Sequence, residues 1–593
     1  MTKEYATSKP KTCYLPLEID PQLQSTQFRI ATILPGEWSD PIRCDLSVHS
    51  LQNPPPYETI SYAWGDSNDT NKILIGDVEL TIPNSLWLCL RHLRNNQVGL
   101  ALWTDAVCIN QTDLEERAAQ VMMMGEIYPR CENMYIWFGE PGPWVSEVNH
   151  AFGMFLHWAE DRHFFEYPGF SRVEGTGDWV FRDNDAYRQM YEVFVDLVAR
   201  PWWTRLWCVQ EIALCPRAVV VLGGWRMEWA TVLRARDNYF RHAVGCCEGV
   251  SDALPARYTY FLDHMLFLSQ RFDVADMDQL VRSLRHKLCK DPRDKIYGLL
   301  GLLPRAGLQA SYSIPVRKLY QDVTEIIISQ ANGDLQFLTG SGLGSRNYDL
   351  PSWIRDFAAP LSAAEASHEY TRYKAYALYK AAGQTKSNAK VVNGDVLSVS
   401  GTFVDSISCI GTPIQDKDWP HIISTIQAWA TLADIPPPLA PDPGPSSPQS
   451  RFWRTLLADC IPSLHSGVAE MTRIPAVPEV SLSGWFFDAK TRLERGEEPL
   501  ITPQVHAVWR ATHGRRFFCT EKGAFGLCFP HVREGDEAWV LEGGNVPFVL
   551  RGVDRDAGAL EKRGMVGESY LHGFMDGEAV GSGDLDMAEV LLV

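Results

Sequence analysis

The residues best suited to chemistry in this sequence lie in RPWWTRLWCVQEIALC, residues 200–215, in which one glutamate follows three tryptophans. Pro201 predicts the start of a helix, because proline fits the first helical position, where its missing N–H is not needed. On such a helix, with about 100° between residues, four side chains share one face about 100° wide: Trp203, Trp207, Gln210 and Glu211. A carboxyl that is partly desolvated among indoles has a raised pKa or binds a cation or hydroxyl. Glu211 is therefore a candidate catalytic residue; alternatively it pairs with Arg205 while the tryptophans fill the core.

Two other stretches place polar side chains at the ends of predicted strands. YETISYAWGD reads as a buried strand that ends in SYAWGD, and LALWTDAVCI reads as a second buried strand. In parallel sheets ligands bind at the carboxyl ends of the strands, so Ser61, Tyr62, Asp66 and Asp105 are candidate binding residues. The alternative for Asp66 is an ordinary turn. The alternative for Asp105 is a structural salt bridge, with Arg117 as its partner.

Metal and nucleotide motifs are weak by comparison. The sequence contains no GxxxxGK[ST], HExxH, GxSxG or kinase motif. No CxxC pairs recur at zinc spacing. His242 lies near Cys246, Cys247 and Glu248, which is a slight metal signal that chance spacing outweighs. We therefore expect no metal site and no bound cofactor.

Composition excludes several classes of partner. Acidic residues outnumber basic ones by 73 to 55, which gives a net charge of −18, so neither nucleic acid nor an anionic membrane is an expected partner. The 14 cysteines are scattered, and we expect reduced thiols, with Cys108 and Cys208 in the core rather than acting as nucleophiles. The first residues lack the apolar run of a signal peptide, and no window approaches 18 uninterrupted apolar residues. A cytoplasmic protein, or more broadly one of a reducing cytosolic or nuclear compartment, is expected.

The hydrophobic pattern predicts several regions along the 593 residues. Short apolar strands alternate with helices up to about residue 230, which is typical of a doubly wound, mostly parallel α/β sheet. DLEERAAQVMMMGEIY reads as a helix, with the preceding Thr112 as its predicted N-cap and Glu115 as the capping-box partner. The predicted regions are an N-terminal extension (1–50), the α/β domain (51–230), a mainly helical region (231–385), a β-rich segment (386–435), a Pro-rich linker (436–450), and a helix followed by a small β-barrel or sandwich (451–593).

Three of these stretches together resemble a known family. YETISYAWGD, LWTDAVCINQ with ERAAQVMMMGEIY, and RPWWTRLWCVQEIAL, in this order and spacing, look like the three blocks of the fungal heterokaryon-incompatibility (HET) domain. The resemblance covers about residues 57–215. DPRDKIYGLLGL, LPSWIRDF and RRFFCTEKGAFGLCFP extend it, because they resemble the architecture shared by many fungal HET-domain proteins.

This resemblance implies a role in non-self recognition and programmed cell death between fused hyphae, with the HET domain as the toxic effector. HET domains are similar in turn to Toll/interleukin-1 receptor (TIR) domains, flavodoxin-like α/β folds of which some hydrolyse NAD. On that similarity Glu211 matches the catalytic glutamate, and NAD would be a substrate rather than a cofactor. The resemblance also implies binding roles for strand-end residues (Ser61, Tyr62, Asp66, Asp105), for base-stacking tryptophans (Trp203 or Trp207) and for a phosphate contact (Arg117).

A non-catalytic alternative remains open. The chain carries neither a P-loop nor the repeats that often follow a HET domain as a sensing arm, so its trigger is not defined. It could then act as an interaction module that recruits other HET-domain proteins, or further copies of itself, through its helical faces. The two hypotheses differ in one respect: a hydrolase needs Glu211 to face an open cleft at the strand ends, whereas a module does not.

Overall fold

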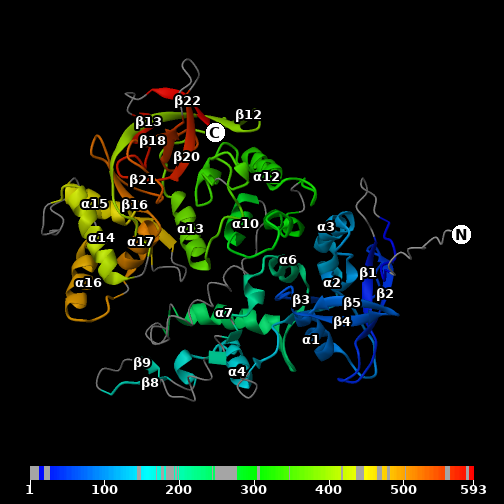
Figure 1. The fold of residues 1–593 in the computed structure, drawn as a ribbon. Coiled ribbons are helices and arrows are strands. Elements are labelled where there is room, and N and C mark those ends of the chain that lie inside the picture. Colours follow the sequence, from blue (N-terminus) through cyan, green and yellow to red (C-terminus); the bar gives the residue numbers. More distant parts are fainter. Residues whose placement is uncertain are drawn as a thin grey trace. The chain divides into compact units, whose positions relative to one another are not determined.

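The computed structural model forms two compact units, Met1–Ile314 and Pro315–Val593 (Figure 1). It describes residues 12–18, 27–142, 148–167, 170–174, 179–181, 192–193, 196–197, 199–243, 245–247, 277–303, 307–345, 347–415, 418–435, 447–463, 470–476, 481–500, 502–553, 561–581 and 586–593. The predicted helical region 231–385 spans the division between the units. Of the helices in these ranges, none combines the length and apolar character needed to cross a membrane.

Unit 1 is built on a nine-stranded mixed sheet. Its strands, in spatial order, are β11 (Trp225–Glu228), β10 (Ala218–Leu222), β7 (Met134–Trp137), β3 (Glu58–Tyr62), β6 (Leu100–Trp103), β1 (Gln27–Ile33), β2 (Arg43–Ser50), β4 (Thr70–Ile75) and β5 (Val78–Pro83). The four central strands β10, β7, β3 and β6 are parallel neighbours. The pairs β11–β10, β6–β1, β1–β2 and β4–β5 are antiparallel.

The strands β2 and β4 also pair in parallel. The prediction of a mostly parallel sheet therefore holds for the centre and this pair, and the sheet as a whole is mixed. One cause is that β1 and β2, which lie in the predicted N-terminal extension, pair with each other and join the sheet beside β6. Another is the hairpin β4–β5, which the sequence did predict around Gly76 and Asp77. Gly76 takes a φ of 57° there, a left-handed conformation that tight hairpin turns require and that glycine adopts without strain.

Helices cover both faces of the central strands. Ser61 and Tyr62 are consecutive on β3, so their side chains point to opposite faces of the sheet. Ser61 contacts Glu211 of α6 (Trp207–Leu214). Tyr62 is in register with Trp137, whose ring lies 5.3 Å from His92 of α1 (Asn84–Leu93). Therefore α1 and α6 lie on opposite sides of the parallel strands (Figure 1).

The long helix α3 (Leu114–Arg130) confirms one predicted element but corrects its cap. The Asp113 side chain, not Thr112, accepts hydrogen bonds from the backbone N–H groups of Glu115 and Glu116. The Thr112 hydroxyl instead donates to the Asn110 side chain at 2.7 Å. An aspartate and a threonine are both good N-caps, so the sequence left two adjacent candidates and the turn at Asn110 selects the second.

Other elements of unit 1 flank the sheet. They are α2 (Asp105–Cys108), α4 (Val148–Ala159), the 3-10 turn η2 (Phe164–Glu166), the hairpin strands β8 (Phe170–Arg172) and β9 (Trp179–Phe181), the 3-10 turn η3 (Pro201–Thr204), α7 (Trp229–Ala243), α10 (Met277–Leu284), α11 (Asp294–Tyr297) and η4 (Leu300–Leu302). Helix α11 begins at Asp294 and not directly after the Asp291-Pro292 pair, which is a typical helix-start signal. The amphipathic stretch AYRQMYEVFVDLVAR lies largely outside the described residues.

Unit 2 combines helices with a closed barrel. Its helices and 3-10 turns are α12 (Val316–Gln330), η5 (Gln336–Leu338), η6 (Asn347–Asp349), α13 (Ala363–Tyr376), α14 (Trp419–Leu432), α15 (Pro448–Leu456), α16 (Gly484–Glu494), α17 (Pro503–Thr512) and α18 (Glu578–Gly581). Its strands are β12 (Lys390–Val392), β13 (Val396–Ile410), β14 (Cys460–Ser463), β15 (Glu470–Arg473), β16 (Arg516–Thr520), β17 (Phe525–Cys528), β18 (Glu537–Leu541), β19 (Phe548–Gly552), β20 (Lys562–Glu568), β21 (Tyr570–Leu571) and β22 (Met587–Leu592).

The barrel closes because β13 is long enough to serve two neighbours on each side. Successive pairings run from β18 through β19, β20 and β22 to β13, and β13 pairs back with β18. The remainder of β13 pairs with β16, which continues to β17 and β21. Of the two predicted architectures, barrel and sandwich, the barrel is the one that forms. The predicted β-rich segment 386–435 thus supplies the central strand of the same barrel as residues 516–592. Within the predicted linker, residues 436–446 lie outside the described part, and α15 begins at Pro448.

Candidate functional site

Glu211 lies against the carboxyl end of strand β3. The Ser61 hydroxyl donates a hydrogen bond to its carboxyl oxygen Oε2. The Trp202 indole N–H donates in turn to the Ser61 oxygen at 2.7 Å. Ser61 is fully buried, and only 7% of Glu211 is exposed. Glu211 thus has a hydroxyl partner at a strand end, and the Trp202 indole is linked to it through Ser61.

The wrong tryptophans were selected because residues 201–214 do not form one helix. They form the 3-10 turn η3, then an extended connection, then α6 from Trp207. The connection is extended because Arg205 pairs with Leu288 as in a parallel ladder, and Leu206 N–H donates to the Leu288 carbonyl at 3.0 Å. This break rotates η3 relative to α6. Trp203 consequently does not lie on the helix that carries Glu211, whereas Trp207, Gln210 and Glu211 remain together on α6.

The pKa of the Glu211 carboxyl is raised to about 7, chiefly because burial removes it from water. Arg205 opposes the shift as a nearby cation, and the Ser61 hydrogen bond also favours the charged form. Near neutral pH the carboxyl therefore exchanges between its neutral and its ionised form. A carboxyl in this range can act as a general acid or base.

A second carboxyl, Asp105, lies at the end of the neighbouring strand β6. The strand ends at Trp103, and Asp105 opens the short helix α2, so it is not within the strand as predicted. Its two oxygens accept from the Tyr62 hydroxyl at 3.2 Å and from the Trp64 indole N–H at 3.1 Å. Burial raises its pKa too, against the lowering effect of Arg205. Two carboxyls with raised pKa thus lie at the carboxyl ends of adjacent parallel strands.

Arg205 connects these two groups. Its guanidinium donates to the Tyr62 carbonyl oxygen. It is also the cation that acts on both Glu211 and Asp105. Arg205, Asp105 and Trp64 are half-buried, whereas Glu211 and Ser61 are buried. The sequence analysis named Arg205 only as a structural partner of Glu211.

Several predicted binding residues lie elsewhere. Asp66 is exposed, and its side chain closes a turn by accepting from the Asn68 backbone N–H at 2.9 Å, which is the alternative considered for it. Arg117 does not pair with Asp105. Its guanidinium lies 3.6 Å above the Tyr312 ring and 4.0 Å from the Asp291 carboxylate. Arg117, which was expected to contact a phosphate, is therefore engaged with Tyr312 and Asp291.

The two predicted base-stacking tryptophans are also engaged in the interior. Trp203 is 2% exposed and packs 5.3 Å from Phe138. The Trp207 indole N–H lies 3.4 Å from the Asp294 carboxylate, and burial raises the pKa of Asp294 to about 6. The Trp203 ring is therefore not free to stack on a ligand in this conformation, whereas the Trp207 ring is half-buried. Cys108 and Cys208 are buried, as predicted.

The side chains around Glu211 form one cluster, which comprises Ser61, Tyr62, Trp64, Asp105, Tyr128, Trp202, Arg205 and Glu211. Three of its members were not predicted from the sequence. Trp202 lies outside the predicted face, because an uninterrupted helix would point it away from Glu211. Tyr128 of α3 reaches the Glu211 carboxyl with its hydroxyl, and no local spacing links these two residues. Trp64 belongs to the quoted SYAWGD stretch, so its position after β3 was a signal that could have been used.

Comparisons with known proteins locate this cluster in a family. Residues 57–211 match the family model "Heterokaryon incompatibility protein (HET)". This range holds the whole cluster and ends at Glu211. The chain is a HET-domain protein. Downstream of the HET domain, residues 489–585 match the model "Het-6 beta-barrel domain", which corresponds to the barrel of unit 2 without β13 and β22.

The HET-domain protein also resembles a curated relative along nearly its full length. "Heterokaryon incompatibility protein 6, OR allele" of Neurospora crassa is 23% identical, and the match covers 93% of this chain and 94% of the relative. The shared length includes both the HET domain and the barrel. No solved structure matches this HET-domain protein.

Proposed function

We propose that this protein acts in fungal non-self recognition, as an incompatibility effector that causes cell death after hyphal fusion. The support is the likeness to a heterokaryon incompatibility protein over nearly the whole of both chains. The two matched modules occur in one chain, with the HET domain first and the barrel last. The HET domain would then be the part that acts, and the trigger would reach it from the rest of the protein or from a partner.

Within this role we assign the centre of the unit 1 sheet to the doubly wound, TIR- or flavodoxin-like class. The support is the order of the parallel strands. Along the sheet these strands lie in the order β6, β3, β7 and β10. If they are numbered 1 to 4 by their order in the sequence, the spatial order is 2-1-3-4. This is the beginning of the flavodoxin-like order, in which ligands bind outside the carboxyl ends of the strands. Helices on both faces of β3 and β7 agree with it.

The chemistry that the cluster supports best is hydrolysis of a nucleotide N-glycosidic bond, with NAD as the substrate. Water would attack the ribosyl carbon, the bond from this carbon to nicotinamide would break, and nicotinamide would leave. Such a reaction passes through an oxocarbenium-like centre that an adjacent carboxylate stabilises. Glu211 would take this role and Asp105 would contact the ribose hydroxyls. The single observation that carries this assignment is the presence of two carboxyls with raised pKa at adjacent parallel strand ends.

A second candidate function is favoured by the burial of Glu211. Its carboxyl is 7% exposed and is bound by Ser61, whose oxygen is itself held by Trp202. In this conformation a substrate cannot reach it. Hydrolysis therefore requires that the two segments that carry Trp64 and Arg205 move away from Glu211. Without such a movement the cluster is structural, and the HET domain acts by recruiting partner proteins.

Expression of the full chain in a fungal host separates the two candidates. Wild type, Glu211→Gln and the control Glu126→Gln, whose side chain is exposed on α3, are compared for growth arrest and cellular NAD. Hydrolysis predicts that wild type and Glu126→Gln lower NAD and stop growth, and that Glu211→Gln does neither. Recruitment predicts equal growth arrest in all three with unchanged NAD. That result would remove Glu211 from the mechanism.

The incompatibility role itself is tested by hyphal fusion. A strain that lacks the gene and a strain that expresses the full chain are each fused with a panel of wild isolates, and viability of the fused cells is scored with a vital dye. The expected result is that cell death after fusion with some isolates depends on the gene. Equal viability with and without the gene across the panel would contradict the role.

A further inference from the structure

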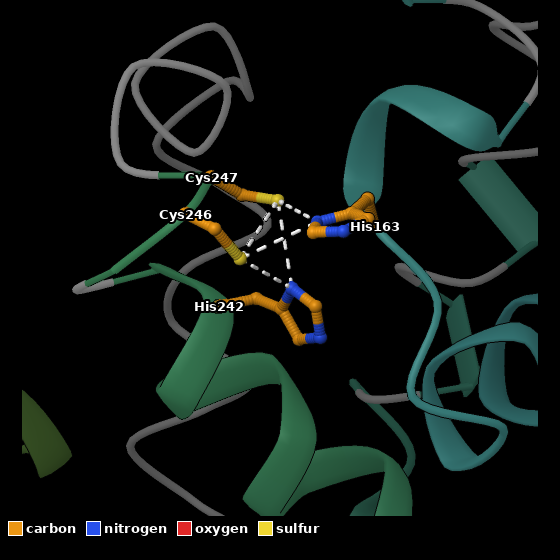
Figure 2. A group of neighbouring side chains, drawn as sticks. All are labelled: His163, His242, Cys246 and Cys247. Carbon is orange, nitrogen blue, oxygen red and sulfur yellow. Dashed lines mark hydrogen bonds between the residues drawn. The ribbon is translucent and has the colours of Figure 1, made fainter.

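Two histidines and two cysteines of unit 1 converge outside the cluster around Glu211. His163 follows α4, His242 lies in the last turn of α7, and Cys246 and Cys247 follow that helix. Their four potential ligand atoms all lie within 4.8 Å of one another. Figure 2 shows the two sulfurs and the two rings pointing toward a common centre. The sequence signal at His242, Cys246 and Cys247 was set aside as chance spacing, and Glu248 lies outside the described residues.

The sulfur–sulfur distance and the four sulfur–nitrogen distances have the size of the corresponding edges of a zinc tetrahedron. With Zn–S bonds of about 2.3 Å and Zn–N bonds of about 2.0 Å, a tetrahedral ion separates two sulfurs by about 3.8 Å and a sulfur from a nitrogen by about 3.5 Å. The Cys246 and Cys247 sulfurs are 3.9 Å apart. The His163 Nδ1 atom lies 3.3 and 3.4 Å from them, and the His242 Nδ1 atom lies 3.1 and 3.6 Å from them.

A carboxylate holds one of the rings in the orientation that a metal needs. The Nε2 atom of His242 lies 2.9 Å from the Asp161 carboxylate. A hydrogen on Nε2 leaves the lone pair on Nδ1, which faces the sulfurs. Histidines that bind metals almost always donate their other N–H to a carboxylate or carbonyl in this way. Asp161 takes a φ of 61°, a conformation that is uncommon for a residue other than glycine.

The other ring is held by stacking. His163 lies parallel to Phe165, with centroids 4.9 Å apart and an interplanar angle of 13°. It also meets His242 edge to face at 4.9 Å. Both imidazoles are therefore positioned before any ion arrives, which lowers the entropic cost of binding.

We propose that His163, His242, Cys246 and Cys247 bind a Zn²⁺ ion in a closed, structural site. Two thiolates and two imidazoles in tetrahedral arrangement are typical of zinc. Four protein ligands leave no position for water or substrate, so the site is structural and not catalytic. Binding converts each thiol to a thiolate, and two protons leave for each zinc that enters. This site is independent of the proposed function of the cluster around Glu211.

The zinc ion would fasten the segment after α4 to the end of α7. These helices already pack together, with the Trp158 and Tyr239 rings 5.1 Å apart and with the Asn238 side chain donating to the Trp158 carbonyl at 2.7 Å. The ion adds a link beyond the helix ends, where Cys246 is exposed. Because such an ion binds the folded chain far more tightly than the unfolded one, it stabilises unit 1.

The test uses the full chain, expressed with added zinc and purified without chelators. Metal content by mass spectrometry should give about one zinc per chain. Cys246→Ser and His163→Gln should each lose most of this zinc, whereas the controls Cys215→Ser and His49→Gln should keep it. The controls remove a cysteine and a histidine of the same unit that lie outside the cluster. Wild-type chain without zinc, or equal zinc in all variants, would overturn the proposal.

Two further measurements guard against a variant that fails to fold. Cobalt added to the metal-free wild-type chain should give the visible absorption of a tetrahedral thiolate complex, and one equivalent of zinc should abolish it. A chelator should lower the melting temperature of wild type but not that of Cys246→Ser. A vicinal disulfide between Cys246 and Cys247, detected by mass spectrometry in chain purified under reducing conditions, would exclude both thiolate ligands and would overturn the proposal.

Asp161→Asn tests the positioning role of the carboxylate. We expect zinc affinity to fall about 10- to 100-fold, as for other carboxylates that orient a ligating histidine. Competition with a chromophoric chelator measures this affinity. The ligands remain in this variant, so the stoichiometry should stay at one zinc in excess metal. Unchanged affinity would remove Asp161 from the site.

Discussion

Replacing Glu211 by glutamine should change how the stability of unit 1 depends on pH. Glutamine keeps an oxygen that accepts from Ser61, but it cannot ionise. In wild type the pKa of the buried carboxyl is raised from 4.5 to about 7. The folded state therefore holds a proton that the unfolded state has released between these values. The stabilising effect of this proton is complete below the unfolded pKa and is lost as pH rises through the folded pKa.

The size of the effect follows from the same two values. At about 1.4 kcal/mol for each tenfold change in proton affinity, wild type loses roughly 3 kcal/mol between acid and alkaline pH. Glu211→Gln does not lose it. Relative to wild type, the free energy of unfolding of the variant should therefore rise by about 2 to 3 kcal/mol between about pH 5 and about pH 8.

Urea unfolding at several pH values measures this difference. The two units need not unfold together, so hydrogen exchange of peptides from β3 and α6 reports the unit that holds Glu211. Glu126→Gln serves as the control, because its side chain is exposed on α3, and its difference from wild type should stay constant. A constant difference for Glu211→Gln as well would refute the reasoning. It would mean that Arg205 and Ser61 keep the carboxyl ionised despite its burial.

Two other predictions concern contacts that hold unit 1 together. Glu116→Leu should lower the free energy of unfolding by about 3 to 5 kcal/mol, because it leaves the buried Arg29 guanidinium, 1% exposed and bound to Glu116 at 2.5 Å, without its carboxylate partner. In urea unfolding, the double variant with Arg29→Met should recover most of this free energy. A double variant whose loss is the sum of the two single losses would contradict the pairing. Asp113→Ala should lower the free energy of unfolding by about 1 kcal/mol, measured by thermal unfolding, because α3 loses its cap. Thr112→Ala should lower it clearly less. The reverse order would show that the cap is Thr112.

Elements with strong local patterns could be predicted from the sequence. The strand β3, the hairpin β4–β5 and the helix α3 each carry their signal within a few residues: an apolar run, a Gly-Asp turn, and capping residues before an amphipathic stretch, although the cap is Asp113 and not the predicted Thr112. Sheet order carried no such signal. The pairing of β1 with β6, and the closing of the barrel by β13, join segments that are distant in the sequence, and the pattern of each segment alone does not reveal its partner.

The candidate site was predicted in part for the same reason. Glu211 and Ser61 meet as expected, since strand ends in a parallel sheet gather at one edge. Trp202 replaced Trp203 because a contact with Leu288 breaks the helix, and this contact comes from a later segment of the chain. His163 was not connected with the other three residues of the proposed zinc site because it precedes them by a long stretch of chain. A search for ligands at fixed spacing cannot find such a set.

The long strand β13 has a consequence for how the protein is made. Its partners include β18 and β22, the last strand of the chain. While the ribosome synthesises the intervening residues, β13 exposes unpaired N–H and C=O groups along both edges, which is a template for pairing with other chains. Contacts of such high sequence separation also form slowly. Loss of Met587–Leu592 would therefore leave the edge of β13 that β22 covers open to pairing with other chains.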